Sequence, residues 1–282
     1  MGWENLMNNQ NNKSQLITLA SIMISFLVMM FVSKIIGLIL IALVISFSIY
    51  KQSYLINVIK GNKAYAIKDF DTALEKYKKA VTSKFVNAGV IRGYILIELK
   101  HGNPETANKV LTNILNTRTF NSHELLALNV SKALILWKLG NIDKAINTLK
   151  NLLENEKSTY IYETLTTLLL IEGNINESLE IIEEGLDYDE NNTILKSNFG
   201  EANYKLGNID IAEETFSSLL EENVSFIEPY YFSALLLKEK DQKDKAIELL
   251  KSGLETNDSL LTTVSKDDAQ KVLDELIICG DI

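Results

Sequence analysis

The chain has 282 residues, enough for one or two domains or for an array of short repeats. Its single cysteine excludes an intramolecular disulfide framework, and its two histidines leave too few ligands for a standard structural zinc site. A net charge of −9 and a pI near 5.0 disfavour a protein that binds nucleic acid by neutralising phosphates. The mean hydropathy of +0.04 is high for a chain with 23% charged residues, so apolar residues must be concentrated somewhere.

The apolar residues are concentrated in residues 16–50, after a polar N-terminal tail, residues 1–15. A membrane-spanning helix needs about 20 residues, so this block is long for one span and slightly short for two. We predict a transmembrane hairpin of two short helices with its turn near residues 33–37. The alternative is one span, with the other half lying at the membrane interface or re-entering the membrane. The polar tail before the block disfavours a cleaved signal peptide.

The flanking lysines predict the orientation, because positive charge near a span is retained on the cytoplasmic side. Lys13 precedes the block, and Lys51, Lys60 and Lys63 follow it, whereas Lys34 in the turn favours the opposite orientation weakly. We therefore expect a multi-pass protein of the cell membrane, with two spans and a cytoplasmic C-terminal region. The first 53 residues carry a net charge of +2 and the remainder −11, which favours a soluble region held off an anionic leaflet.

A self-similar pattern begins near Tyr54. A short polar turn is followed by a small residue, and each turn lies between two apolar-periodic stretches, which is typical of a helix, a tight turn and a second helix. The small residues are spaced by 34, 38, 33, 34 and 34 positions. We assign the four extra residues to a lengthened loop at residues 116–123. The small residues are Ala73, Ala107, Ala145, Ser178, Ala212 and Ala246.

The turn chemistry supports this placement. Four turns begin with glycine, which we expect to end the first helix in the left-handed conformation, and the Asn or Asp after it can cap the second helix. Pro104 lies where a second helix begins. One position of the first helix is small in four units, where it is Gly61, Ala133, Gly200 or Ala234, whereas the second and fourth units have Ile95 and Thr166 there. A large residue lies near the middle of each second helix: Tyr77, Leu111, Leu149, Ile182, Phe216 and Leu250.

This pattern resembles the tetratricopeptide repeat, a helix–turn–helix unit of 34 residues. The resemblance covers residues 54–258 and is clear in the first unit, with Ala73, Tyr77 and Ala80 on its second helix. It implies an all-α protein, with an α-solenoid of about six repeats after the N-terminal transmembrane hairpin. Residues 259–282 are expected to form a C-terminal capping helix, from Ser265 to Ile278, over the last repeat.

No catalytic motif occurs in the chain, and we predict neither an enzyme nor a cofactor or metal. His101 lies at the end of a helix, where the dipole favours a histidine, and no nucleophile or carboxylate constellation accompanies it. Cys279 has no activating motif. The segment from Asp187 to Asn198 matches the opening of a calcium loop, but it lacks the glycine and the bidentate glutamate that such a loop needs.

The remaining candidate site is the concave surface that the first helices of such a solenoid line. Its apolar middle suits an amphipathic helix or an extended apolar peptide, whereas the alternative is that these residues only pack against neighbouring repeats or the C-terminal helix. The resemblance implies a partner-binding groove formed by Asn62, Tyr65, Arg92, Leu96, Leu99, Val130, Leu134, Trp137, Glu163, Thr167, Leu170, Asn198, Glu201 and Tyr204.

We expect a membrane-anchored scaffold that binds a protein or peptide partner through this groove, and we expect no nucleic-acid partner. The alternatives are a structural protein that self-assembles through its repeats, since homo-oligomerisation is possible, and an accessory subunit of a membrane or cell-envelope complex.

Overall fold

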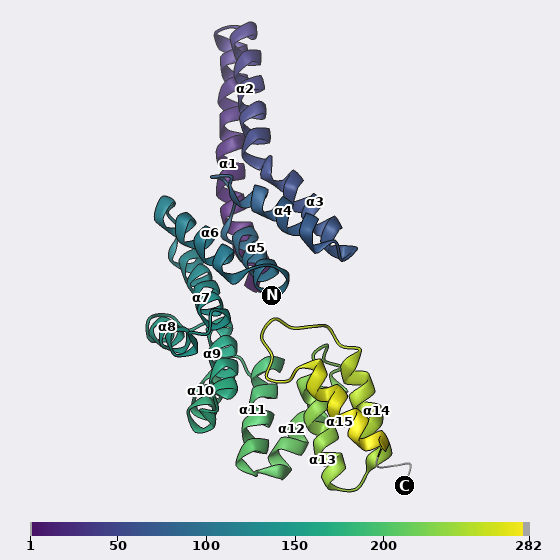
Figure 1. Ribbon diagram of the computed structural model, residues 1–282. Helices are drawn as coiled ribbons and strands as arrows, with labels where there is room; N and C mark the ends of the chain where they lie inside the picture. Colours follow the sequence, from purple (N-terminus) through teal and green to yellow (C-terminus); the bar gives the residue numbers. More distant parts are fainter. Residues whose placement is uncertain (1, 279–282) are drawn as a thin grey trace. The chain divides into compact units, whose positions relative to one another are not determined.

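The computed structural model describes residues 2–278, and the described chain is all-helical, without a β-strand (Figure 1). The chain divides into two compact units, with the boundary between Tyr94 and Ile95, inside one helix. The first unit contains α1 (Gly2–Phe31), α2 (Lys34–Gln52), α3 (Tyr54–Ala66), α4 (Phe70–Val81) and the start of α5 (Ala88–His101).

In the first unit, α1 and α2 form a helical hairpin whose turn is at Val32 and Ser33. Gly37 lies within α2 and not in the turn: a Cβ there would overlap Met29 of α1, so the missing side chain lets the two helices approach closely. The hydroxyls of Ser21 and Ser25 donate to the carbonyls four residues earlier, at 2.8 and 2.7 Å. These bonds satisfy polar atoms in an otherwise apolar surface.

Most large apolar side chains of this hairpin are exposed, among them Phe31 at 78% and Ile35 at 71%. Within residues 2–278, one helical stretch, Lys34–Ala66, is long and apolar enough to cross a bilayer, whereas the apolar part of α1, Leu16–Phe31, is shorter. The helical hairpin is therefore present in the fold, and its insertion as two spans stays a prediction.

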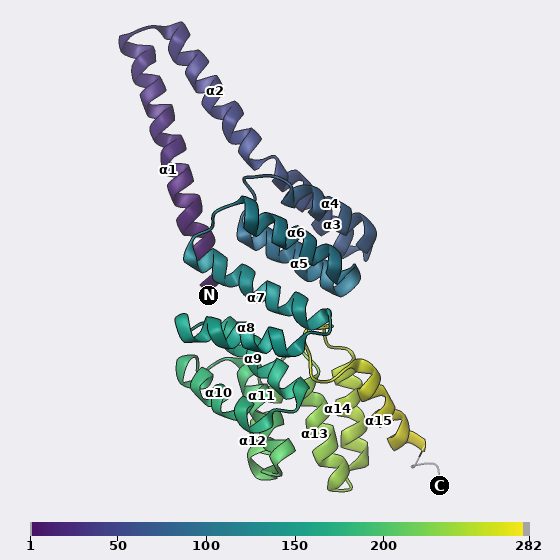
Figure 2. The same cartoon turned by 60° about the vertical axis from the view of Figure 1, so that its left-hand side comes forward.

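Six helix pairs follow, as the spacing predicts. In chain order the pairs are α3 and α4, α5 and α6, α7 and α8, α9 and α10, α11 and α12, and α13 and α14. The two helices pack directly on each other in the first, third, fourth, fifth and sixth pairs. Figure 2 shows α7 to α10 stacked as successive antiparallel helices. The helices of the second unit after α5 are α6 (Pro104–Thr117), α7 (Ser122–Lys138), α8 (Ile142–Asn155), α9 (Thr159–Glu172), α10 (Ile175–Tyr188), α11 (Thr193–Leu206), α12 (Ile209–Glu221), α13 (Glu228–Glu239), α14 (Lys243–Leu254) and α15 (Lys266–Ile278).

Small residues on the first helices face large ones on the second helices. A Cβ on Gly61 would lie 2.6 Å from the ring of Tyr77, and one on Gly200 would lie 2.8 Å from the ring of Phe216. Both glycines and both rings are buried. The periodic glycines therefore mark the places where an aromatic ring of the second helix rests against the backbone of the first.

One expectation about the turns is wrong, and another holds only in part. The four extra residues do not form a lengthened loop, because the connection at residues 118–121 is short and α7 has 17 residues against 14 in α9. A capping box between Asn121 and Glu124 starts α7 early, so most of the insertion is helical.

The glycine and capping predictions hold only in part. Gly140, Gly173 and Gly207 have positive φ, but Gly102 does not. Asn103 accepts from the Thr106 N–H at 2.8 Å and caps α6, whereas Asn141, Asn174 and Asn208 make no such bond with their helices. At Asn141 and Asn208 the side-chain amide instead donates to Leu139 and Asn203 respectively, because the left-handed glycine turns it back toward the preceding helix.

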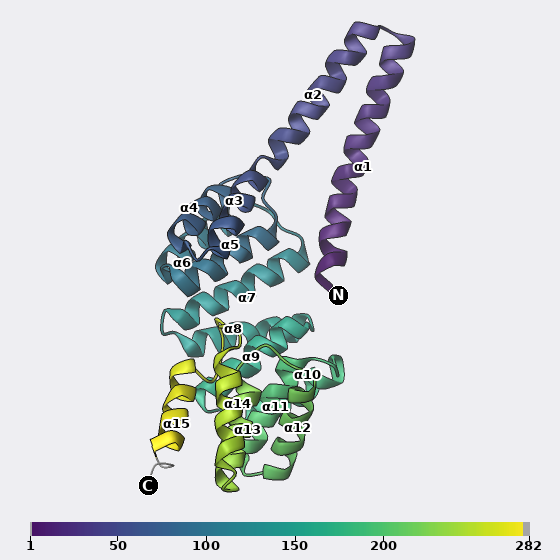
Figure 3. The same cartoon turned by 90° about the vertical axis from the view of Figure 1, so that its right-hand side faces the viewer.

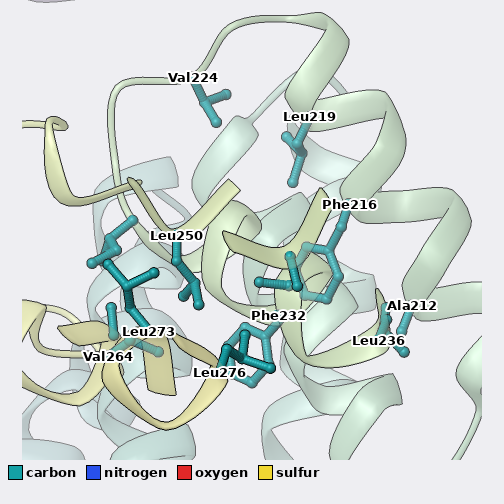
Figure 4. Close-up of a cluster of buried hydrophobic side chains, with 14 residues drawn as sticks. Ala212, Phe216, Leu219, Val224, Phe232, Leu236, Leu250, Val264, Leu273 and Leu276 are labelled. Atoms are coloured by element: carbon teal, nitrogen blue, oxygen red, sulfur yellow. The ribbon is translucent and has the colours of Figure 1, made fainter. Parts of the chain in front are cut away.

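The C-terminal helix α15 packs next to α14 (Figure 3). Ser265 and Asp268 exchange hydrogen bonds at its start, and Ala269, Leu273 and Leu276 on its buried face join the core of the last repeats. Figure 4 shows this core, in which Phe216 and Phe232 stack at 5.4 Å and Val264, just before α15, is buried.

Candidate functional site

The connection between α14 and α15, residues 255–265, is here called the strap. Figure 1 shows the strap, in yellow, extending away from α14 before it turns back into α15. Its side chains and backbone make hydrogen bonds to side chains of α5, α11 and α13, which are first helices of repeats and are expected to line the groove. The strap is thus an extended peptide segment placed against the predicted binding surface.

The centre of the strap makes hydrogen bonds to two buried glutamates. The Thr262 hydroxyl lies 2.6 Å from Glu228 Oε1 at the start of α13, and the Thr263 N–H donates to the same oxygen at 3.3 Å. The Thr263 hydroxyl donates to Glu201 Oε2 on α11. Glu201 also pairs with Lys205 one turn later, at 2.7 Å. These carboxylates have almost no solvent contact, so the strap supplies partners that water cannot.

The rest of the strap is held at several further points. Lys100, near the end of α5, donates to the backbone oxygen of Asp258 at 2.7 Å, and Leu261 packs against the apolar cluster of α7, α8 and α9. The Asn257 N–H donates to the Ser225 carbonyl at 3.2 Å. Lys266 closes the strap on itself, because its ammonium bonds to the Thr256 carbonyl at 2.7 Å and lies 3.1 Å from the Asp258 carboxylate.

Burial changes the proton affinity of the acids on this surface. Burial raises the pKa of Glu228 above its ordinary value, and the hydrogen bond from Thr262 opposes that rise. Burial likewise raises the pKa of Glu163, against the hydrogen bond from Asn192 at 2.7 Å. At the end of α5, burial beside Lys100 lowers the pKa of His101, and Asp258 of the strap opposes the change.

The predicted groove residues divide into three groups. Several are buried core residues, among them Val130, Leu134 and Leu170, as the packing alternative requires. Arg92, Leu99, Thr167, Asn198 and Glu201 are also buried, and Asn198 donates to the hydroxyls of Thr166 and Thr167 at 2.8 and 3.0 Å. The remaining residues keep some or all of their exposure: Asn62, Tyr65, Leu96, Trp137, Glu163 and Tyr204.

Three of the more exposed residues contact side chains of their own repeat or of the next one. Asn62 accepts from the Tyr77 hydroxyl, and the ring of Tyr65 lies 5.4 Å from that of Phe70, so both contact the second helix of their own repeat. Tyr204 lies 5.3 Å from Phe232 and donates to Glu239 at 3.0 Å, and burial raises its pKa to about 12.

Sequence reasoning missed Glu228 and the strap itself. The predicted groove ended at the fifth repeat, whereas Glu228 begins the first helix of the sixth. The available signal was the hydroxyl-rich run from Ser259 to Ser265, which carries little apolar periodicity and was included in the C-terminal capping segment without a role of its own.

The calcium-like segment and Cys279 were the other features that the sequence analysis considered as sites. The calcium-like motif is not one loop, because Asp187 lies in the last turn of α10 and Asn198 lies inside α11. Within the described residues no group of three or more His, Cys, Asp or Glu side chains could hold a metal ion. Cys279 lies outside the described residues.

Comparison with known proteins identifies the repeat. Residues 126–159, which contain most of α7 and all of α8, match the tetratricopeptide repeat family model. The chain contains a tetratricopeptide repeat. No curated protein sequence matches the chain significantly.

Solved structures extend the likeness of fold to most of the chain. A chain of the APC/C hetero-tetramer Cut9-Hcn1 is 14% identical with a TM-score of 0.58, over 79% of this chain and 43% of that one. The pilF protein of Pseudomonas aeruginosa is 13% identical with a TM-score of 0.54, over 79% of this chain and 98% of that one. A tetratricopeptide repeat protein from Parabacteroides merdae ATCC 43184 is 17% identical over 80% of this chain and 99% of that one, with a TM-score of 0.48.

The family match and the shared fold support a tetratricopeptide repeat protein. Such repeats imply a scaffold for protein interactions, and proteins built from them are generally not enzymes.

Proposed function

We propose that this chain is a membrane-anchored tetratricopeptide scaffold that binds an extended segment of a partner protein on the surface now covered by the strap. In this proposal residues 16–50 anchor a repeat domain, residues 54–258, on the cytoplasmic side, and residues 259–282 close its end. The partner segment takes the place of the strap.

The observation that carries the proposal is the set of contacts between the strap and the first helices. Thr262 and Thr263 present hydroxyl and amide donors to Glu228 and Glu201, and Leu261 presents an apolar side chain to the cluster of α7 to α9. A partner segment that alternates hydroxyl and apolar side chains in the same way would satisfy the same buried acids. Its chemistry is therefore that of an extended peptide rich in Thr, Ser, Leu and Val.

The test uses the strap sequence as the probe. In the full chain, Thr262→Val with Thr263→Val removes the side-chain donors that hold the strap while keeping the shape of both residues. A hydrogen bond to a charged group contributes about 1.5–3 kcal/mol, so we expect the variant to bind a synthetic peptide of residues 255–265 at least about tenfold more tightly than the parent chain does. Fluorescence anisotropy of a labelled peptide measures this.

The matched control adds Glu201→Met and Glu228→Met to the same strap variant. These changes keep the approximate size of both side chains but remove the acceptor oxygens, so peptide binding should fall back by a similar factor. Equal peptide binding by the parent chain, the strap variant and the control would refute the exchange of strap and partner.

Partner engagement in membranes is tested by photo-crosslinking from Leu96 and Trp137, which are half-buried, and from the exposed Glu183 on α10 as a control. Crosslinks to one partner that arise from the first two positions, and that increase in the strap variant, support the proposal. Crosslinks only between copies of the chain would instead indicate the self-assembling alternative.

A further inference from the structure

The first unit contains an open cavity of about 530 Å³ at the end of the apolar hairpin helix α2. One wall is the end of α2 and the start of α3, with Tyr50 and Tyr54, and the other wall is the end of α4 and the following turn, with Lys79, Ser83 and Lys84. This cavity shares no residue with the strap or with the predicted groove.

The lining of the cavity suits an anion. It includes two lysines and several hydroxyl groups and contains no aspartate or glutamate. The nearest acidic partner of Lys79 is Glu75, at 2.5 Å, and Glu75 is exposed outside the cavity. The Ser83 hydroxyl accepts from the Phe85 N–H at 3.3 Å, which leaves its own proton for a ligand. Ammonium and hydroxyl donors that converge on one cavity are the groups that bind a phosphate.

With α2 spanning the membrane as proposed above, aromatic rings would place this cavity at the depth of lipid headgroups. The ring of Phe85 lies 6.2 Å from Phe47 and 5.7 Å from Tyr50, both near the end of α2, and the Lys51 ammonium lies 5.7 Å from the centres of the Phe47 and Phe85 rings. Aromatic rings and lysines at the end of an apolar helix are typical of the interface between hydrocarbon and water.

The residues that follow the apolar helix are basic, whereas the rest of the chain is acidic. Residues 51–94 carry nine Lys or Arg and three Asp or Glu, a net charge of +6, whereas residues 95–282 carry 17 and 33, a net charge of −16. The basic residues are thus gathered in the repeat that directly follows the apolar helix. A basic segment next to a membrane helix is attracted to anionic lipids.

We propose that this cavity binds the phosphate of an anionic lipid headgroup, with Lys79 and Lys84 as the cationic donors and the Ser83 hydroxyl as a neutral one. The proposal rests on the membrane anchoring proposed above. It adds a lipid ligand and a specific site, which anchoring alone does not require.

The test measures lipid retained by the full chain after reconstitution into vesicles of phosphatidylcholine, with or without phosphatidylglycerol, by native mass spectrometry. The variant Lys79→Gln with Lys84→Gln removes both cavity charges. Its matched control, Lys60→Gln with Lys63→Gln, removes the same charge from exposed positions of α3 outside the cavity. We expect the cavity variant to retain about tenfold less phosphatidylglycerol and the control to retain nearly as much as the parent chain.

Each other outcome overturns the proposal. Equal losses in both variants would show that overall charge and not the cavity selects the lipid, and no loss in either would remove the site altogether. Displacement of the lipid by an equal concentration of glycerol 3-phosphate would identify a site for soluble phosphates instead. Lys79→Arg with Lys84→Arg should restore retention, and its failure to do so, with the helical circular dichroism unchanged, counts against the assignment.

The anchor itself is assayed separately by extraction of the vesicles at alkaline pH. A chain that integrates but shows no lipid preference refutes the lipid site alone. A chain that is extracted refutes the anchoring, and the lipid site with it.

Discussion

At the scale of single residues, five of the six turns inside the repeats place a residue at positive φ in the same position. Three of these residues are Gly140, Gly173 and Gly207, but Lys68 and Asp241 adopt the same conformation, with φ of 61° and 58°. A side chain costs about 1–2 kcal/mol in this region, because its Cβ approaches the following carbonyl oxygen. The two non-glycine turns therefore reduce the stability of the first and sixth repeats.

Asp241→Gly should stabilise the chain by about 0.5–1 kcal/mol, because relief of the backbone strain exceeds the extra entropy that glycine has when unfolded. Asp241 is exposed, so little packing is lost with its side chain. Thermal unfolding followed by circular dichroism would show a higher midpoint. The converse change, Gly207→Ala, should lower the midpoint, and equal midpoints for both variants would contradict the argument.

A second effect at this scale is the contact between glycine and aromatic ring within a repeat. Gly200→Ala should destabilise the chain by about 1–3 kcal/mol, because the new methyl group would lie 2.8 Å from the Phe216 ring in a core that cannot expand freely. Urea unfolding measures the loss.

Two controls separate crowding from helix propensity. Gly89→Ala, also in a helix, meets only the Asn87 side chain and should be neutral or slightly stabilising. Adding Phe216→Leu to Gly200→Ala should cost less than the sum of the two single changes, since the smaller side chain makes room for the methyl group. Strict additivity would contradict the proposed contact.

At the scale of elements, the strap is the feature whose stability depends on pH. The pKa of Glu228 is raised by burial under the strap, and Glu201 beside it raises it further, while opening of the strap exposes the carboxyl to water. The closed state therefore binds the proton more tightly than the open state. This contribution to closure is fully present below the ordinary pKa of glutamate and is lost as the pH rises through the raised pKa of Glu228.

We therefore expect the strap to open more readily as the pH rises from acid toward neutrality. Hydrogen exchange of residues 256–265, corrected for the intrinsic pH dependence of exchange, should show protection that falls over this window. Glu228→Gln keeps an acceptor for Thr262 but does not titrate, so it should flatten the curve. The half-buried Glu163 remains in that variant, and an unchanged curve would assign the effect to Glu163 or another acid.

At the scale of the whole molecule, the chain combines an apolar hairpin, a basic first repeat and an acidic remainder. The basic residues 51–94 follow the hairpin directly, and the acidic residues 95–282 carry the strap and its surface. An anionic membrane should attract the first part and repel the second. In the proposed scaffold, this separation would hold the strap-covered surface away from an anionic leaflet.

The predicted two-span topology can be tested by labelling introduced cysteines. In a chain whose single cysteine, Cys279, is replaced by serine, new cysteines at Ser14 and Ser53 should react with a membrane-impermeant maleimide from one side of the membrane. A cysteine at Lys34, between the two helices, should react from the other side. Labelling of Ser14 and Ser53 from opposite sides would instead show a single span.

Much of the fold could be predicted from the sequence, because the signals are local. The spacing of small residues predicts the six helix pairs, and Pro104 marks the first residue of α6. The insertion before Ala145 was assigned to the loop, but it lengthens α7, which begins at a capping box formed by Asn121 and Glu124. A longer helix and a longer loop add the same number of residues, so the spacing alone does not distinguish them. Whether Asn141, Asn174 and Asn208 cap their helices depends on the backbone conformation of the glycine before each of them, which the sequence does not reveal.

By itself the sequence determined the class of the protein, since a 34-residue period and an apolar block are periodic or contiguous properties that need no long-range information. Only the tertiary structure decided what lies on the predicted groove. Thr263 contacts Glu201 across 62 positions of sequence, and Lys100 contacts Asp258 across 158. No local pattern encodes such pairs, because they depend on the sum of all the small rotations between successive helices.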